Sequence, residues 1–132
     1  MGKKKKRKHR HAPEIRYGEN RHHLIFQARH WNHGYSKLLR EHMTRMLDVN
    51  IHSHLHNFVL HDVPKPSDAE IKRIWLKYQE ESWYVDQLDI VSLADWLAKA
   101  ADDAAFRACM VRQRDYLYGA LSKRGGIQRP PP

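Results

Sequence analysis

Apolar residues in the second half of the chain recur at the three- and four-residue intervals of an α-helix. Four of them stand at positions i, i+3, i+4 and i+7: Ile71, Ile74, Trp75 and Tyr78. Ser67 and Glu70 come just before them with the spacing of a capping box, in which two side chains satisfy the first amides of a helix. One apolar face at this period predicts a helix that packs one side against a core.

Two further helices are expected after this one. Ser92 is the expected start of the first, which carries three apolar residues: Leu93, Trp96 and Leu97. The second is expected over residues 103–123, with Gly125 as a stop signal behind it. Its apolar stripe has six members: Phe106, Cys109, Met110, Leu117, Ala120 and Leu121. We therefore predict a helical extension over residues 64–126.

The first half of the chain is less regular. Residues 22–27 predict a short strand, because bulky β-prone side chains occupy Leu24, Ile25 and Phe26. Ser36 is a candidate N-cap for a helix that runs on to Met46. A second short strand over residues 46–49 is the alternative, so the pattern leaves open whether residues 36–46 are helix or strand.

A further helix is expected over residues 51–61, with Asn50 as its N-cap. Its apolar positions have helical spacing: Ile51, Leu55, Phe58 and Val59. Together with the helical extension, these elements predict a small α+β protein that is mostly α overall.

Positive charge is concentrated at the start of the chain. Its first 11 residues hold seven of the 24 basic residues and no acid: Lys3, Lys4, Lys5, Lys6, Arg7, Lys8 and Arg10. The rest of the chain is close to balanced, with 17 basic against 15 acidic residues. Like charges repel and bury nothing, so we expect disordered tails over residues 1–13 and 127–132. The basic tail suits sequence-independent contact with phosphates, and a solubilising or nuclear-localisation role is the alternative.

Composition also excludes several protein classes. No apolar run approaches the ~20 residues that a transmembrane helix needs, so no membrane partner is expected. The basic start is not followed by the apolar segment of a secretory signal. Cys109 is the single cysteine, which excludes a disulfide framework and a cysteine zinc knuckle. We expect a cytoplasmic protein, or a nuclear one in a eukaryotic host.

Histidine is the most unusual feature of the composition, since nine of the 11 histidines lie between residues 22 and 61. His52 and His56 are four residues apart on an expected helix, so they share one face and can hold one metal ion. His22 and His23 are adjacent on an expected strand, where neighbouring side chains point to opposite sides.

A catalytic metal site needs a third protein ligand and an open position. His22 or His23 is the natural third ligand for an ion on His52 and His56. The other imidazole would stay free, with an ordinary pKa of ~6.5 that suits proton transfer near neutral pH. An ion beside a free imidazole is an arrangement that can hydrolyse phosphodiesters.

The pair His22-His23, a loop that contains an asparagine, and the helical pair His52 and His56 resemble the HNH (His-Me finger) nucleases. The branch found in bacterial DNase toxins, which lacks zinc-knuckle cysteines, is the most similar. The resemblance covers about residues 20–62 and implies a ββα-metal finger, which we place over residues 14–63.

The resemblance also implies roles for single residues. His23 would be the general base, and His22, His52 and His56 would hold the ion. Asn32 would be the middle asparagine that fixes the loop and orients the base. In the family this asparagine usually lies nearer the second strand.

The function implied is a metal-dependent endonuclease that hydrolyses nucleic-acid phosphodiester bonds, on DNA rather than RNA. The ion would be divalent: Mg²⁺, Zn²⁺, Ni²⁺ or Mn²⁺. Arg21, Arg29 and Arg40 are candidate phosphate clamps, because the guanidinium fork matches phosphate geometry. The basic tail would raise affinity without specifying sequence.

Several alternatives remain open. The histidines could form a structural or inactive metal site, or bind no ion. The chain could be a non-catalytic nucleic-acid-binding accessory protein of a phage or mobile element. It could also be a helical protein–protein interaction module, which would use four aromatic residues: Trp75, Trp83, Trp96 and Tyr116. The remaining finger histidines are expected to face solvent or form hydrogen bonds: His30, His33, His42, His54 and His61.

Overall fold

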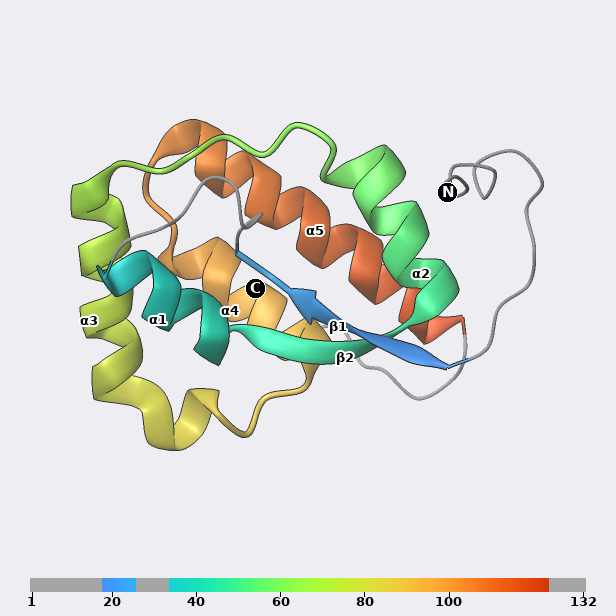
Figure 1. The fold of residues 1–132 in the computed structure, drawn as a ribbon, viewed down its shortest axis with the longest axis horizontal. Helices are drawn as coiled ribbons and strands as arrows, with labels where there is room; N and C mark the ends of the chain where they lie inside the picture. The colour runs from blue at the N-terminus through green and yellow to red at the C-terminus, as the bar shows by residue number, and fades with distance from the viewer. Residues whose placement is uncertain (1–17, 26–33, 124–132) are drawn as a thin grey trace, which may run out of the picture.

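The computed structural model describes residues 18–25 and 34–123. Over these residues the chain is mostly helical, with one antiparallel sheet of two strands (Figure 1). The predicted α+β, mostly α fold class is confirmed. The basic tail, Arg29, Asn32 and the C-terminal tail lie outside the described residues, so their proposed roles stay predictions.

The sheet pairs strand β1 (Glu19–His23) with strand β2 (Thr44–Asp48). Glu19 lies opposite Asp48, and His23 lies opposite Thr44. The strand predicted over residues 22–27 therefore has the wrong bounds, because regular pairing ends at His23.

Leu24 and Ile25, which had suggested the strand, instead enter the core, where each is 1% exposed. Consecutive burial of two side chains breaks the alternation of a strand. Residues 36–46, for which the sequence allows either helix or strand, contain both. Helix α1 (Gly34–His42) begins before Ser36, and strand β2 follows it from Thr44.

Helix α2 (Val49–His54) leads directly into the π-helix η4 (Leu55–Val59). The N-cap is Asp48, whose Oδ1 accepts hydrogen bonds from the amides of Asn50 and Ile51 at 2.9 and 3.1 Å. The prediction that Asn50 caps this helix is therefore wrong, since the last residue of β2 already does so.

Phe58 was expected on the apolar face of this segment, but it is 68% exposed. A π-turn bonds i to i+5, so it holds more residues per turn than an α-turn and rotates later side chains away from the α-helical face. The Leu60 amide donates to the Leu55 carbonyl at 2.8 Å in this pattern, and both of these leucines are buried.

Three helices form the second half: α3 (Asp68–Val85), α4 (Ile90–Ala100) and α5 (Ala104–Ser122). The predicted cap of α3 is confirmed, since Ser67 Oγ accepts from the Glu70 amide at 3.1 Å. All four apolar residues on which this helix was predicted are buried. Helix α4 begins before Ser92, because Asp89 is its N-cap and accepts from the Ser92 amide at 2.9 Å.

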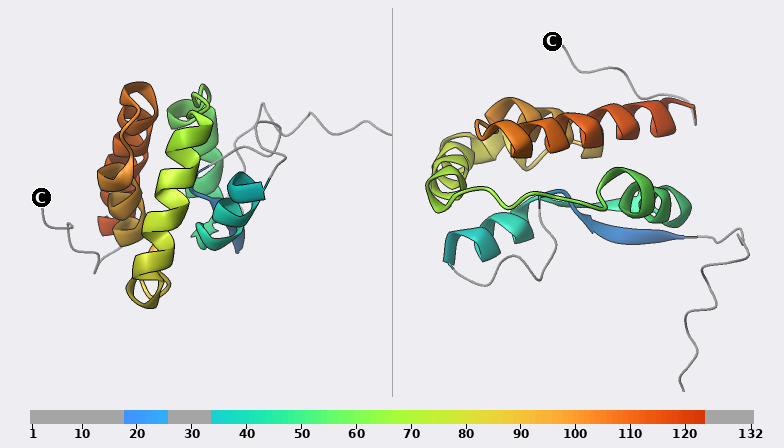
Figure 2. Two further views of the ribbon diagram at one scale, coloured as in Figure 1. Left: turned by 90° about the vertical axis from the view of Figure 1, so that its left-hand side faces the viewer. Right: turned by 90° about the horizontal axis from the view of Figure 1, so that it is seen from above.

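Helices α4 and α5 lie side by side, and α5 also contacts η4 (Figures 1 and 2). We call β1, β2, α2 and η4 the finger. Figure 2 shows α5 on one side of the finger, with α1 away from it on the other side. One buried apolar cluster contains residues from both halves, including Leu24, Leu55, Phe106 and Met110.

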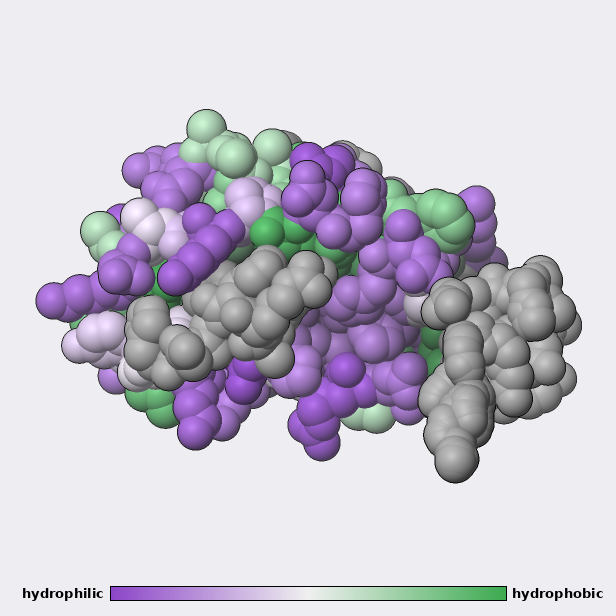
Figure 3. Space-filling model, turned by 45° about the horizontal axis from the view of Figure 1, so that its top comes forward, coloured by the Kyte–Doolittle hydropathy of each residue, from purple (hydrophilic) through white to green (hydrophobic). Residues whose placement is uncertain are grey.

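The visible face in Figure 3 is mostly hydrophilic, with hydrophobic side chains in small separate areas. Among the four residues of the interaction-module alternative, Trp75 and Trp96 are buried and Trp83 is 75% exposed.

Cys109 is fully buried, as expected of a core thiol, and this burial raises its pKa. No helix within the described ranges combines the length and apolar character needed to cross a membrane.

A buried carboxylate joins α3 to the start of α5. Glu70 is 3% exposed, and its Oε2 accepts hydrogen bonds from the amides of Asp102 and Asp103. Its Oε1 pairs with Arg73 at 2.7 Å. The side chain thus satisfies two amides at the entrance to a helix.

Replacing Glu70 with Ala should lower the free energy of unfolding by about 3 kcal/mol, since hydrogen bonds to a charged group are lost and two amides lose their acceptor. Urea denaturation followed by circular dichroism measures this. Glu80→Ala, at an exposed position of the same helix, should change it by less than ~0.5 kcal/mol. Equal effects of the two variants would contradict the role assigned to Glu70.

Candidate metal centre

Three histidines from three elements converge in the finger: His22 of β1, His52 of α2 and His56 of η4. Each offers one nitrogen, and these three nitrogens lie within 4.8 Å of one another. The ring centroids are 4.6 to 5.2 Å apart, and each pair of rings meets edge to face. This histidine cluster could hold a metal ion, and no other such group occurs in the described part of the chain.

Local structure explains why these rings meet. Along β1 the side chain of Arg21 is exposed, that of His22 is fully buried and that of His23 is half-buried. His52 and His56 lie one turn apart on the helical segment that contacts β1. The turn that carries His56 is π-helical, a form that is frequent at functional sites.

The buried His22 ring has two different nitrogens. Nε2 lies 2.6 Å from Oε1 of Gln113, which can only accept, so Nε2 carries the proton. Nδ1 is buried and has no hydrogen-bond partner among the described residues. A buried nitrogen without a partner is costly, and it is what a metal ligand leaves behind when no ion is present. The donor set therefore fits a metal ion.

Electrostatics keep the cluster neutral. Burial, with smaller contributions from His56, His52 and His23, lowers the pKa of His22 to about 3, against the opposing effect of its hydrogen bond to Gln113. Burial is also the largest cause that lowers the pKa of His52 and of His56. Neutral imidazole is the form that binds metal, so the cluster is ready to bind at neutral pH.

Sequence reasoning missed two residues that contact the cluster. Asn20 Nδ2 lies 3.3 Å from His52 Nδ1, and its place two residues before His22 on one strand was the available signal. Gln113 contacts His22 from 91 residues away. Its signal was a polar residue at helical spacing between the buried Met110 and Leu117.

His23, the predicted base, does not belong to the cluster but lies near it. Its charge lowers the pKa of His52 and His56. Its own pKa is lowered, first by burial and then by the positive charges of Arg40 and Arg21.

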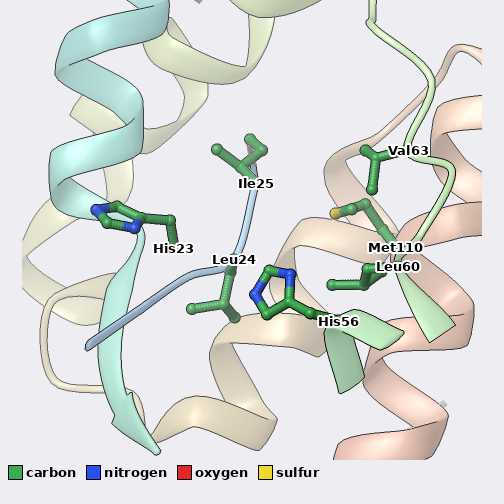
Figure 4. A pocket seen from close by; sticks show the side chains of 7 residues that line it. All are labelled: His23, Leu24, Ile25, His56, Leu60, Val63 and Met110. Atoms are coloured by element: carbon green, nitrogen blue, oxygen red, sulfur yellow. The ribbon is translucent and has the colours of Figure 1, made fainter. Parts of the chain in front are cut away.

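His23 and His56 line one small hollow together with Leu24, Ile25, Leu60, Val63 and Met110 (Figure 4). Its volume of about 10 Å³ is close to the space that one water needs. In the view of Figure 4, Leu24 is drawn between the two imidazoles.

The two described arginines of the predicted phosphate clamp, Arg21 and Arg40, lie close enough to His23 for their charges to lower its pKa. Arg21 is exposed. Arg40 is half-buried, and its Nε has no hydrogen-bond partner within the described ranges.

The other described histidines stay outside the cluster. His42 Nδ1 lies 2.9 Å from the Tyr78 hydroxyl, His54 stacks on Tyr116, and His61 is exposed. His30 and His33 lie outside the described residues.

Comparisons of the chain with protein-family models, with curated proteins and with solved structures found no match.

The cluster should bind one Zn²⁺ per chain, as isothermal titration calorimetry can measure. His56→Ala should weaken binding by more than about 100-fold, since loss of an outer-shell partner alone costs about 10- to 100-fold and a direct ligand contributes more. His61→Ala, an exposed histidine outside the cluster, should bind like the parent protein. Equal affinities of the two variants would exclude this cluster as the Zn²⁺ site.

Acid should destabilise the metal-free protein. The pKa of His22 is about 3 in the folded protein against the usual 6.5, so below pH 6.5 the unfolded chain binds a proton that the folded chain does not. The free energy of unfolding is therefore highest above pH 6.5. It falls progressively as the pH drops toward 3, by about 1.4 kcal/mol per pH unit for this group.

Urea denaturation with a chelator at pH 7, 6 and 5 measures this dependence. His22→Asn should make it shallower, since one of the three histidines with a lowered pKa is then absent, and His61→Ala should leave it unchanged. The same slope in His22→Asn as in the parent protein would show that another group carries the pH dependence.

Proposed function

We propose that this protein is a metal-dependent endonuclease that hydrolyses nucleic-acid phosphodiester bonds, as the HNH resemblance implies. The observation that carries the proposal is the histidine cluster, with a separate imidazole, His23, next to one of its members. A cluster with three neutral nitrogens and no fourth protein ligand among the described residues leaves a position for substrate or water.

The order of elements supports this proposal. His22 lies on a strand, a second antiparallel strand follows, and His52 and His56 lie on the helix directly after it. This is the strand, strand and helix order of a ββα-metal finger. Helix α1 comes between the two strands along the chain, as an additional element.

The donor set favours a borderline transition ion over Mg²⁺. Imidazole nitrogen suits Zn²⁺, Ni²⁺ and Cu²⁺, whereas Mg²⁺ prefers carboxylate oxygens and water. No carboxylate belongs to the cluster within the described residues. We therefore propose Zn²⁺ or Ni²⁺ as the resident ion.

The chain's own residues would divide the remaining work. His23 takes a proton from the attacking water, because its lowered pKa keeps it unprotonated at neutral pH. Arg21 and Arg40 hold the phosphate beside it. A bound divalent ion supplies charge stabilisation at the phosphoryl and leaving oxygens.

Nucleic acid is the proposed substrate because of the basic tail. Seven cations within eight residues, Lys3 to Arg10, suit a polyanion of any sequence. The same tail favours the second candidate function, a nucleic-acid-binding protein that does not cut. That candidate expects binding that weakens with salt, and no cleavage with any ion.

His23→Ala should lower the rate of plasmid DNA cleavage by at least about 100-fold, because general base catalysis contributes roughly 10²- to 10⁴-fold. Its Zn²⁺ affinity should stay unchanged, since His23 is outside the cluster. Gel assays of nicking and linearisation, with Mg²⁺, Mn²⁺, Ni²⁺ and Zn²⁺ in turn, measure the rate.

His61→Ala is the matched control and should cut at the parent rate. If the parent protein leaves both DNA and RNA intact with all four ions, the enzymatic proposal fails and the binding function is favoured. If His23→Ala cuts normally, the base is a different residue.

A further inference from the structure

We propose that Gln113 is a positioning residue of the metal site, which holds the His22 ring so that Nδ1 is the nitrogen available to an ion. Helix α5, outside the finger, would thereby set the metal affinity. This inference rests on the histidine cluster as the metal site and deepens the proposed function.

Both ends of the Gln113 amide are used. The side chain is fully buried, and its Nε2 donates to the backbone carbonyl of Leu24 at 2.8 Å. A carbonyl oxygen can only accept, so this bond fixes which end of the amide is which. Oε1 of Gln113 must then be the atom directed at His22, and it lies 2.6 Å from Nε2 of the His22 ring.

The consequence for His22 is a single ring orientation and a single tautomer. With Oε1 of Gln113 accepting at Nε2, the ring proton is held there and Nδ1 stays bare. Rotation of the ring by half a turn would place a carbon atom against Oε1 and lose the hydrogen bond. A metal-binding histidine generally donates a hydrogen bond from the N–H of its other ring nitrogen to such a partner, which orients the ring and fixes its tautomer.

Gln113 also forms hydrogen bonds to two residues at the end of strand β1. It contacts the side chain of His22 and the backbone of Leu24, the first residue after β1. Helix α5 is thus bonded to the strand end on both sides of His23. Helix α5 also contacts η4, which carries His56. Its position therefore influences two of the three members of the cluster.

Three variants separate a positioning role from simple packing. Gln113→Leu removes both hydrogen bonds and places an apolar side chain at the same position in the core. Gln113→Glu keeps an acceptor for His22 Nε2 and removes the amide donor to Leu24. Leu117→Met is the matched control, since Leu117 is buried four residues later on the same helix and the exchange conserves volume.

Calorimetric titration with Zn²⁺ tests the inference, with circular dichroism to confirm that each variant is folded. Gln113→Leu should weaken Zn²⁺ binding by about 10- to 100-fold, the usual effect of losing an outer-shell partner. Gln113→Glu should restore the affinity to at least that of the parent protein, and Leu117→Met should leave it unchanged. If Gln113→Leu binds like Leu117→Met, or Gln113→Glu binds as weakly as Gln113→Leu, Gln113 has only a packing role.

A measurement on the parent protein covers the case in which Gln113→Leu does not fold. Nitrogen-15 NMR of the metal-free protein at neutral pH should find the proton of His22 on Nε2, whereas a proton on Nδ1 would overturn the inference. Failure of the parent protein to bind Zn²⁺ would instead remove the metal site itself. The two failures are therefore distinguishable.

Discussion

The buried imidazole of His22 is the constraint on which the finger depends. A polar ring in an apolar interior must satisfy its nitrogens, because an unpaired buried polar group costs a substantial fraction of the stability of a small protein. One nitrogen is satisfied by Gln113, while the other has no partner within the described ranges. The chain therefore keeps an unfavourable feature at the point where three histidines meet. Such a feature is expected where binding compensates it.

This constraint explains why the helical half matters to the finger. A strand pair and a short helix bury little surface by themselves. Here α5 supplies Gln113 to the cluster and Met110 to the apolar cluster that also contains Leu24 and Leu55. Glu70 in turn anchors the start of α5 to α3. The rigidity of the cluster therefore depends on contacts that begin far from it in the sequence.

Much of the architecture could be predicted from local pattern. The spacing of His52 and His56 placed two imidazoles on one face, and the apolar period of α3 located its buried side. Both signals come from residues close together on a helix, so they can be recognised in a single sequence. The strand bounds could not be found in the same way, because Leu24 and Ile25 are β-prone residues whose burial takes them out of the ladder. The α2 cap was missed because Asp48 both ends β2 and begins α2.

Contacts between distant segments were the least predictable part of the site. Nothing in the spacing of residues relates Gln113 to His22, although a polar residue inside an apolar stripe is a sign of a buried hydrogen bond. The role of Asn32 and the contribution of Arg29 belong to the segment between Ile25 and Gly34, outside the described residues.

The histidine cluster resists a proton but can gain stability from a divalent metal ion. Protonation of any member would place positive charge beside two other imidazoles in a poorly solvated position, so the folded chain resists protonation. A divalent cation brings more charge than a proton but also offers coordination to all three nitrogens at once. Binding to the folded chain alone then stabilises it by mass action. An ion at this position would therefore strengthen the packing of β1 against α5, and that packing would in turn hold the ligands for the ion.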